Sequence, residues 1–398
     1  MLSLEEARKR ILAKLPSPVP ETVEAREAAG RVLLTAATAR AALPPFDNSA
    51  MDGFALRAED TAKASSDQPA ALRVIGAAAA GGWFAGEVTA ETCVRVFTGS
   101  PLPRGADAVV MQEDTRPDPG NSQGVLILDR VRPWENVRFK GEDVRAGASL
   151  VAAGTRLNAA QTGLLAATGI GHVTVARQPV VGLLATGDEL REPGQPLSPG
   201  QIYESNRATL ATLVSQVGAL PKTYPLVPDD LVATTSALEA ALSECDAVVT
   251  SGGASVGEHD FVKSALGGAL EFWRVAVKPG KPFVFGVSGG RPVFGLPGNP
   301  VSAFVTFLLL VRPALLAMQG DAAPPLASLP GELTEPLVNR GDRRHFLRVR
   351  LDAEGRVWPT GLQASHALGS LAAANGLVDV PPETTLPAGA RVKVLRWE

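Results

Sequence analysis

An apolar run that breaks abruptly into small residues constrains the fold of this chain more than any other feature. The run, Ala247 to Val249, is typical of a buried strand, and the residues after it are rich in glycine and serine. Glycines allow a tight turn whose backbone N–H groups approach a ligand closely, and serine hydroxyls can bind phosphate oxygens. Because a helical pattern follows over 261–266, the stretch predicts an anion site at the carboxyl edge of an α/β sheet. The residues of this turn that we single out are Ser251, Gly252, Gly253, Ser255, Gly257 and Asp260.

Two further turns of small residues follow apolar strands. The sequence Lys278-Pro-Gly-Lys281 places two ammonium groups on a stiff turn. The segment 295–302 suits the start of a helix, with Asn299 as N-cap and Pro300 at the first helical position. Neither a Walker motif nor a dinucleotide-binding fingerprint is present. The three turns together nevertheless predict one binding pocket for a phosphorylated ligand. The candidate contacts added by these turns are Lys278, Lys281, Pro297, Gly298, Asn299 and Ser302.

Composition narrows the classes of partner. The 398 residues are 45% hydrophobic, which permits sizeable cores and two to four domains. The formal net charge of −3 gives no general electrostatic reason to bind nucleic acid or an anionic membrane. Two distant cysteines, Cys93 and Cys245, fit a reducing cytoplasm without a disulfide framework. The longest apolar run, Val301 to Val311, is too short to span a bilayer and predicts a buried helix.

The first half of the chain combines helical patterns with a β-rich insertion. Ser3 and Glu6 form a capping-box pattern at a first helix, and a second helical stretch is expected over 22–29. Over 44–141, short β-type runs alternate with Gly/Pro turns, which is typical of a small all-β unit. A helical pattern returns over 158–167. We therefore expect a small β unit inserted into an elongated helical domain.

From Pro179 onward, strands alternate with helices across short loops. This alternation predicts a mostly parallel sheet with right-handed crossovers. Ligands on such sheets bind beyond the carboxyl ends of the strands, so the acidic loop Thr186 to Glu189 should meet the glycine turns there. A Pro/Ala-rich linker is expected over 321–330, and the short strands after it predict a small terminal β domain.

Motifs along nearly the whole chain resemble those of the molybdopterin molybdenumtransferase family, whose members insert molybdate into molybdopterin. The run Asn48-Ser-Ala-Met-Asp-Gly53 and the segment 295–302 are distinctive in combination. The matching stretches, in chain order, are 45–55, 97–101, 105–113, 140–143, 186–190, 202–206, 251–260, 278–282 and 295–302.

The resemblance implies a multidomain fold of the α/β plus β type. It comprises an elongated helical domain (1–43 and 144–178) with an inserted small β domain (44–143), a three-layer α/β molybdopterin-binding domain (179–322) and a C-terminal β-barrel domain (323–398). It also implies a homodimer. The active cleft would lie between the α/β and C-terminal domains of one subunit and the inserted domain of the other.

The reaction implied by the resemblance uses adenylylated molybdopterin and molybdate. Mg²⁺ would assist cleavage of the pyrophosphate, AMP would leave, and the dithiolene would hold the molybdenum. A molybdopterin adenylyltransferase and molybdoenzyme chaperones are implied as further partners, whereas nucleic acid and membrane are not expected. The expected location is the cytoplasm. The sequence does not distinguish molybdate from tungstate as the substrate, since both are tetrahedral dianions of similar size.

The resemblance assigns catalytic roles to Asp52, Thr98, Asp143, Glu189 and Asp260. Glu189 and Asp260 would hold Mg²⁺, which takes few carboxylates and completes its shell with water and phosphate oxygens. Each residue also has a simpler structural explanation. Asp52 and Thr98 suit a turn, and Asp143 suits a solvated surface. Glu189 and Asp260 suit the N-terminus of a helix.

The resemblance adds substrate contacts outside the glycine and lysine turns. The family has one acidic residue of the cleft just before the helix expected over 230–242. We take Asp229 as this residue, and Asp230 is the alternative. An arginine and a serine of the terminal domain would lie at the cleft mouth. We take Arg348 as this arginine. Arg344, four residues earlier, is the other candidate, and the side chain of Arg348 could instead point outward from a strand. The full set is Ser251, Gly252, Gly253, Ser255, Asp229, Lys278, Lys281, Pro297, Gly298, Asn299, Ser302, Arg348 and Ser365.

Two alternatives to a molybdate-inserting enzyme stay open. A molybdopterin adenylyltransferase resembles residues 179–322 alone, and the inserted and terminal β domains argue against it. A non-catalytic scaffold of the same fold is the other alternative, and the acids Asp52, Glu189 and Asp260 argue against that. The four histidines show no ligand spacing, so a zinc site is not expected.

Overall fold

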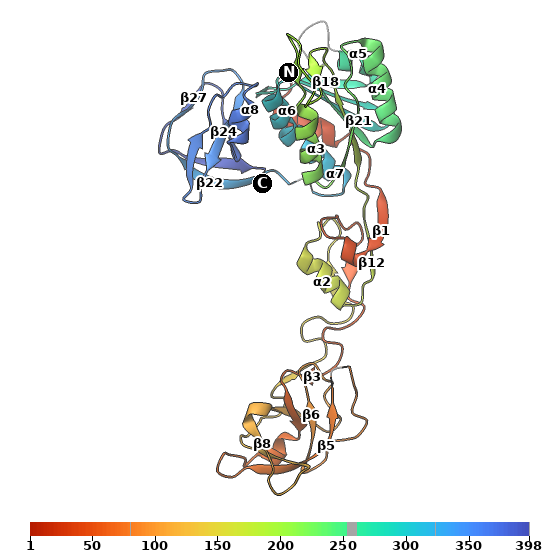
Figure 1. Ribbon diagram of the computed structural model, residues 1–398, viewed down its shortest axis with the longest axis vertical. Coiled ribbons are helices and arrows are strands. Elements are labelled where there is room, and N and C mark those ends of the chain that lie inside the picture. The colour runs from red at the N-terminus through yellow and green to blue at the C-terminus, as the bar shows by residue number, and fades with distance from the viewer. Residues whose placement is uncertain (80, 253–260, 323, 398) are drawn as a thin grey trace.

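The protein is an elongated molecule with a large body at one end and a small β unit at the other, joined by a narrow neck (Figure 1). The computed structural model describes residues 1–79, 81–252, 261–322 and 324–397. Both chain ends lie in the body, and the inserted β unit, drawn in orange, lies at the far end. The body consists of an α/β unit beside a terminal β unit.

A six-stranded mixed sheet lies at the centre of the α/β unit. In spatial order its strands are β16 (Leu220–Thr223), β13 (Val180–Ala185), β17 (Ala247–Ser251), β21 (Arg291–Leu296), β20 (Pro282–Ser288) and β18 (Leu270–Arg274). The first four strands run parallel to one another, as expected, and the last two are antiparallel to their neighbours. β17 contains the apolar run that predicted a strand, and all of its residues are buried.

The antiparallel edge of this sheet contains a β-hairpin that the expected alternation of strands and helices did not include. β20 and β21 pair directly, with Ser288 opposite Arg291. Gly289 and Gly290 between them have φ of +57° and +78°, the left-handed conformation that favours glycine in a two-residue hairpin turn. A Gly-Gly pair between two apolar runs is the sequence signal for this hairpin.

Helices cover both faces of the sheet and produce the expected three layers (Figure 1). One face is covered by α1 (Leu4–Leu12), α3 (Asn206–Gln216) and a long helix over 300–318, and the other by α4 (Leu231–Glu244) and α5 (Phe261–Leu266). Alternation along β13 divides its side chains between the two cores, with Leu183 in the first and Leu184 in the second.

The long helix over 300–318 is the hydrophobic centre of the body. It consists of α6 (Pro300–Thr306), a π-helical turn (Phe307–Val311) and α7 (Arg312–Met318). By length and composition alone it could cross a membrane, but 83% of its apolar window is buried inside the protein. It is therefore the buried core helix that the apolar run predicted, and Pro300 begins it as expected.

Five strands close into a barrel in the terminal unit. They are β22 (Ala327–Leu333), β24 (Arg344–Leu351), β25 (Arg356–Pro359), β26 (Gly376–Val380) and β28 (Arg391–Arg396). The pairings run from β24 through β25, β22, β28 and β26 and return to β24, which closes the ring. The short helix α8 (Leu368–Ala372) precedes β26. The linker expected over 321–330 is shorter than predicted, because Ala327 already pairs with Arg396.

The chain crosses the neck twice, and its outgoing and returning segments pair with each other. The antiparallel pairs are β1 (Pro20–Glu24) with β12 (His172–Ala176), β2 (Ala37–Thr38) with β11 (Ser149–Val151), and β3 (Asn48–Ser49) with β10 (Val137–Arg138). The neck also holds α2 (Ala159–Ala167), the helix expected over 158–167. Asn158 caps α2 and forms a reciprocal capping box with Gln161.

The helical stretch expected over 22–29 is wrong. Residues Pro20–Glu24 form β1, and only a single 3-10 turn (Ala25–Glu27) follows it. Thr22 and Val23 are β-branched and lie opposite residues of β12, so cross-strand pairing decides the local structure.

The inserted unit contains a six-stranded sheet, in agreement with the expected small β unit. In spatial order its strands are β7 (Ala108–Met111), β4 (Gly53–Leu56), β6 (Thr92–Val96), β5 (Ala70–Ala78), β9 (Gly124–Ile127) and β8 (Thr115–Pro117). A Cβ at Gly53 would lie 1.8 Å from the Val110 carbonyl oxygen. The glycine of the Met-Asp-Gly motif therefore allows β4 and β7 to approach each other.

Candidate functional site

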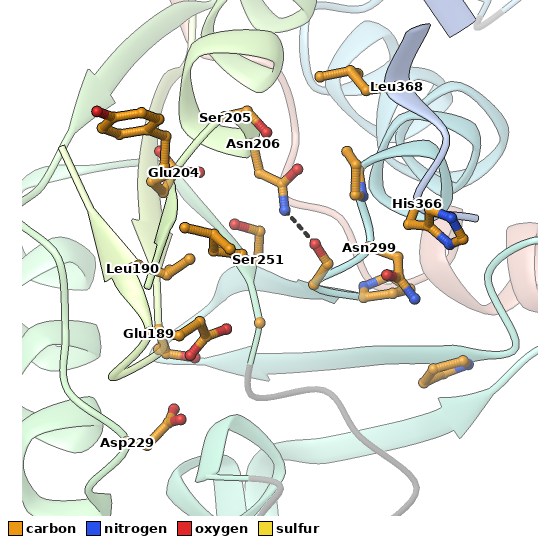
Figure 2. Close-up of a pocket in the computed structure, with 18 residues that line it drawn as sticks. Glu189, Leu190, Glu204, Ser205, Asn206, Asp229, Ser251, Asn299, His366 and Leu368 are labelled. Carbon is orange, nitrogen blue, oxygen red and sulfur yellow. Dashed lines mark hydrogen bonds between the residues drawn. The ribbon is translucent and has the colours of Figure 1, made fainter. Parts of the chain in front are cut away.

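A cavity of about 680 Å³ opens at the carboxyl ends of β13, β17 and β21 (Figure 2). This is the edge at which the acidic loop and the glycine turns were expected to meet. The terminal unit also reaches the cavity, through His366 and Leu368. The other lining residues are Thr186, Glu189, Leu190, Ile202, Tyr203, Glu204, Ser205, Asn206, Asp229, Ser251, Gly252, Pro282, Pro297, Gly298, Asn299 and Pro300.

The turns after β17 and β21 touch each other, and glycines make this contact possible. Gly252 has φ of +84°, and a Cβ there would lie 2.3 Å from the Thr186 carbonyl oxygen. A Cβ at Gly298 would lie 3.6 Å from the Gly252 Cα, which is van der Waals contact. Asn206, at the start of α3, fixes the second turn, because its Nδ2 donates to the Gly298 carbonyl oxygen at 2.7 Å (Figure 2).

Two buried hydroxyls of the cavity lining have no hydrogen-bond partner among the described residues. They are the Oγ of Ser251, which is 2% exposed, and the Oγ1 of Thr186, which is 5% exposed. A buried polar group without a partner is costly, and a bound ligand is one way to satisfy it.

The cavity lining is acidic. Glu189, Glu204 and Asp229 contribute carboxylates, and the described lining residues include no lysine or arginine. Glu204 is buried, and its carboxylate lies 2.9 Å from the Nε of Arg207. Burial opposes the charge of Arg207, but hydrogen bonds to Glu192 and Glu204 raise its pKa above the usual value. Glu189 and Asp229 are exposed, so their carboxylates can reach a ligand.

The structure separates the two candidate acids that precede α4. Asp229 lines the cavity. Asp230 is instead the N-cap of α4, since its side chain accepts a hydrogen bond from the Ala233 N–H at 2.8 Å. Asp229 is also tied to the acidic loop, because its N–H donates to the Asp188 carboxylate at 3.1 Å. Asp229 is thus the acid of this pair that reaches the cavity.

The lysine turn packs against the core helix at the rim of the cavity. Gly280 has φ of +111°, and a Cβ there would lie 2.2 Å from the Thr306 Cγ2. Lys281 directly precedes Pro282, which lines the cavity. Ser302 is buried in the core helix, where its carbonyl oxygen accepts the Thr306 hydroxyl at 2.7 Å, and it is not among the lining residues.

A cationic cluster lies where the lysine turn meets the barrel. β19 (Val277–Lys278) pairs with β24 and places Lys278 opposite His345. Burial, together with nearby Lys278, Arg348 and Arg343, lowers the pKa of His345 to about 4. Both ring nitrogens of His345 and the Nη1 of Arg348 are buried without a hydrogen-bond partner in the described part of the chain. Unpaired donors beside several cations are an arrangement that can hold an anion.

Arg348 does not point outward from β24, so that alternative is wrong: the residue is fully buried. Arg344 pairs instead with Asp379 of the terminal unit and with Glu5 of α1. The carbonyl oxygen of Ser365 accepts a hydrogen bond from the Val301 N–H at 3.1 Å. This bond places Ser365 at the start of the core helix, beside the cavity.

Asp52 and Thr98 are brought together in the inserted unit. The Thr98 N–H and hydroxyl donate to the Asp52 carboxylate at 2.7 and 3.0 Å. These hydrogen bonds hold the pKa of Asp52 below its usual value. Asp143 lies in the neck, where its N–H donates to the Leu43 carbonyl oxygen at 3.1 Å. Within one chain, the inserted unit and the α/β unit, which contains the cavity, lie at opposite ends of the molecule (Figure 1).

Three of the predicted site residues, Gly253, Ser255 and Asp260, lie outside the described residues. Of the two predicted Mg²⁺ ligands, Glu189 is therefore the one that the structure places at the cavity. In the described ranges, no three histidine, cysteine, aspartate or glutamate side chains are grouped so that they could hold a metal ion. A metal site built from described residues would therefore have fewer than three ligands of these residue types from the protein.

Glu204, Asn206 and His366 are among the lining residues that were not predicted as contacts. Glu204 and Asn206 belong to the stretch 202–206, whose motif resemblance was noted without a role for either residue. The signal that could have found Asn206 is its position at the start of a helix after a short polar run. His366 directly follows Ser365, but its approach to the α/β unit depends on packing between distant segments.

Three family models match the chain from end to end. Residues 2–169 match the MoeA N-terminal region (domain I and II). Residues 182–317, which include the cavity turns, match the probable molybdopterin binding domain. Residues 330–397 match the MoeA C-terminal region (domain IV).

Relatives and solved structures agree with these matches. The molybdopterin molybdenumtransferase of Haemophilus influenzae is 38% identical over 99% of this chain and 98% of its own. Molybdopterin molybdenumtransferase 2 of Mycobacterium tuberculosis is 38% identical over 100% of both chains. A crystal structure of the molybdopterin biosynthesis MoeA protein from Pyrococcus horikoshii has a TM-score of 0.83, at 32% identity over 100% of both chains. The chain therefore belongs to the molybdopterin molybdenumtransferase family.

Proposed function

We propose that this protein inserts molybdate into adenylylated molybdopterin and releases AMP, which gives the molybdenum cofactor. The relatives named molybdopterin molybdenumtransferase match the whole chain, which supports a transferase of this kind. The observation that carries the proposal is the acidic cavity at the strand ends, whose volume of about 680 Å³ suits a nucleotide-sized ligand. Its touching glycine turns and unpaired hydroxyls favour a ligand rich in phosphate oxygens.

An acidic cavity suits a pyrophosphate ligand when a divalent cation lies between them. The residues present fit Mg²⁺, because Glu189 and Asp229 offer carboxylate oxygens at the cavity and Mg²⁺ needs only one or two from the protein. In our proposal Glu189 holds the ion, with Asp260 as the second ligand. When bound, Mg²⁺ would stabilise the charge that builds on the phosphate of departing AMP. Asn206 keeps the Gly298 turn in place beside that phosphate.

The cationic cluster at the rim is the site that we assign to molybdate. Lys278 and Lys281 supply positive charge, and Arg348 keeps one unpaired Nη1. Ser365, anchored to the core helix, offers a hydroxyl at the same junction. A tetrahedral dianion would satisfy the unpaired donors of Arg348 and His345 and offset the charge of the lysines.

A homodimer completes the cleft in this proposal. Asp52 and Thr98 belong to the inserted unit, which lies at the far end of the molecule from the α/β unit with the cavity, so they and Asp143 would act on the cavity of a second subunit. We further propose a cytoplasmic location, which the buried free cysteines Cys93 and Cys245 support. A molybdopterin adenylyltransferase would supply the substrate, and molybdoenzyme chaperones would receive the product.

The test is release of AMP by the purified protein. We expect adenylylated molybdopterin to yield AMP only when both molybdate and Mg²⁺ are present. Glu189→Gln removes a ligand charge and should lower the rate at least tenfold, as expected for loss of about 1.4 kcal/mol of transition-state stabilisation. Glu239→Gln, an exposed glutamate on α4, is the matched control and should leave the rate unchanged.

Molybdate-independent release, or no release at all by the unmodified protein, would contradict the proposal. Consumption of ATP with unadenylylated molybdopterin would instead assign the protein to the adenylyltransferases. Full activity of Glu189→Gln would remove this residue from the metal site and leave the overall reaction standing.

A further inference from the structure

His366 differs from every other described residue of the cavity lining. It alone among them can carry a positive charge, and the remaining ionisable residues of the lining are acids. It comes from the terminal unit, whereas Glu189 and Asp229 come from loops of the α/β unit. Figure 2 shows His366 beside Asn299, on the opposite side of the cavity from Glu189 and Asp229. The cavity therefore has an acidic side and a side where an imidazole is available.

The loop that carries His366 is fastened to β24 by the side chain of Arg348. Its Nη2 donates to the carbonyl oxygens of Leu362 and Ala364 at 2.7 and 3.2 Å, and its Nε donates to the Ser370 hydroxyl at 2.9 Å. Arg348 is fully buried, so these hydrogen bonds form in a low-dielectric environment where they are strong.

The backbone of Arg348 is bound to the same loop. The Arg348 N–H donates to Oε1 of Gln363 at 3.0 Å, and Nε2 of Gln363 donates back to the Arg348 carbonyl oxygen at 2.9 Å. The far side of the loop is joined to the core helix by the bond from the Val301 N–H to the Ser365 carbonyl oxygen. The position of His366 is therefore set from both units.

We propose that His366 contacts an anionic oxygen of the substrate and that Gln363, bonded to the Arg348 backbone, is a positioning residue that presents it. This inference rests on the proposed function, because it concerns the same cavity. An imidazole N–H can donate a hydrogen bond to a phosphate or molybdate oxygen, and among the described residues on this side of the lining no carboxylate competes for it. The ligand chemistry is a tetrahedral oxyanion, which is either the phosphate of AMP or molybdate.

The two sources can be separated by equilibrium binding. Calorimetry measures the Kd of AMP with Mg²⁺ and, separately, of molybdate, for the unmodified protein and for His366→Ala and His366→Gln. We expect His366→Ala to weaken one of the two probes about tenfold, as loss of a hydrogen bond to a charged group predicts. His366→Gln keeps an N–H donor and should recover most of that affinity. His172→Ala, an exposed histidine of the neck, is the matched control and should change neither Kd.

The positioning role of Gln363 has its own readout. Gln363→Ala removes both hydrogen bonds between this side chain and the Arg348 backbone, and it should weaken the probe that His366→Ala weakens. Because the effects act through one contact, adding His366→Ala to Gln363→Ala should cost no further affinity. Additive losses would overturn the positioning role.

The outcomes of the binding experiment are distinguishable. If His366→Ala binds both probes within twofold of the unmodified protein, the proposed contact is overturned and the proposed function stands. If the unmodified protein binds neither probe, the proposed function fails and the His366 contact fails with it. Selective weakening of one probe supports the contact and identifies its source.

Discussion

Gly252 leaves no room for a side chain at the centre of the cavity. Its φ of +84° disfavours other residues, and a Cβ would lie 2.3 Å from backbone. We expect Gly252→Ala to lower AMP release at least tenfold, because the turn must move away from Thr186. Gly268→Ala, where nothing lies within 4 Å of a Cβ and no left-handed φ is required, is the control. Equal activity of the two variants would contradict a close-fitting turn.

The Asp52 carboxylate should titrate below its usual range because Thr98 donates two hydrogen bonds to it. A carboxyl group whose pKa is lowered on folding stabilises the fold above its unfolded pKa, and this contribution is lost as pH falls through the folded pKa. Thr98→Val removes one donor, so the Asp52 pKa should rise toward about 3.9. NMR titration measures this directly, and Thr98→Ser should keep the lowered pKa. An unchanged midpoint in Thr98→Val would exclude the hydroxyl as a cause.

Predictability from sequence differs between residues of the cavity. Ser251, Gly252 and Asn299 could be predicted, because each lies in a local strand–turn–helix pattern that fixes it at a strand end. His366 could not, because its position depends on hydrogen bonds between a barrel strand, a loop and the core helix. The sequence could not decide whether Asp229 or Asp230 lines the cavity, because this depends on which of them caps α4, and the structure shows that Asp230 does.

At the scale of elements, local capping signals predicted where α1 and the core helix begin, although the side chain of Asn299 makes no cap hydrogen bond. Ser3 begins α1 by accepting from the Glu6 N–H, as expected, although the Glu6 carboxylate pairs with Arg10 and does not complete the capping box. The segment 22–29 was predicted wrongly, because it lacks such a cap and its structure comes from pairing with a strand far along the chain. Non-local pairing is the information that local patterns do not contain.

The core helix over 300–318 should dominate the stability of the body. Leu310 is fully buried in it, among side chains of α1, α3 and the sheet. We expect Leu310→Ala to lower the free energy of unfolding by about 2–5 kcal/mol, since the cavity left behind adds to the lost burial. Leu329→Ala, at a position 47% exposed on β22, should cost about 0.5 kcal/mol. Chemical denaturation measures both, and equal losses would contradict the role of this helix.

At the scale of the whole molecule, the proposed sharing of the cleft predicts complementation between inactive subunits. Asp52→Asn alters the inserted unit and Glu189→Gln alters the cavity of the α/β unit, and these two units lie at opposite ends of the molecule. A mixed dimer would have one cleft with both changes and one with neither. Random subunit exchange should therefore restore about a quarter of the normal rate of AMP release.

The control for complementation mixes Glu189→Gln with Gly252→Ala. Both changes lie in the same cavity, so no cleft of a mixed dimer escapes damage and the rate should stay low. If Asp52→Asn and Glu189→Gln also failed to complement after verified exchange, the cleft would not be shared between subunits.

The double crossing of the neck has a consequence for how the molecule can change in length. Outgoing and returning strands pair antiparallel, so one residue added to β1 alone would shift its register against β12 and turn its side chains to the wrong face. Two residues added to each of the two strands would preserve the register and extend the span between the ends. Small-angle scattering should then show a larger maximum dimension with unchanged thermal unfolding, whereas a one-sided insertion should lower the unfolding temperature. The distance between the inserted unit and the body is therefore set by two segments, distant in sequence, that have to lengthen together.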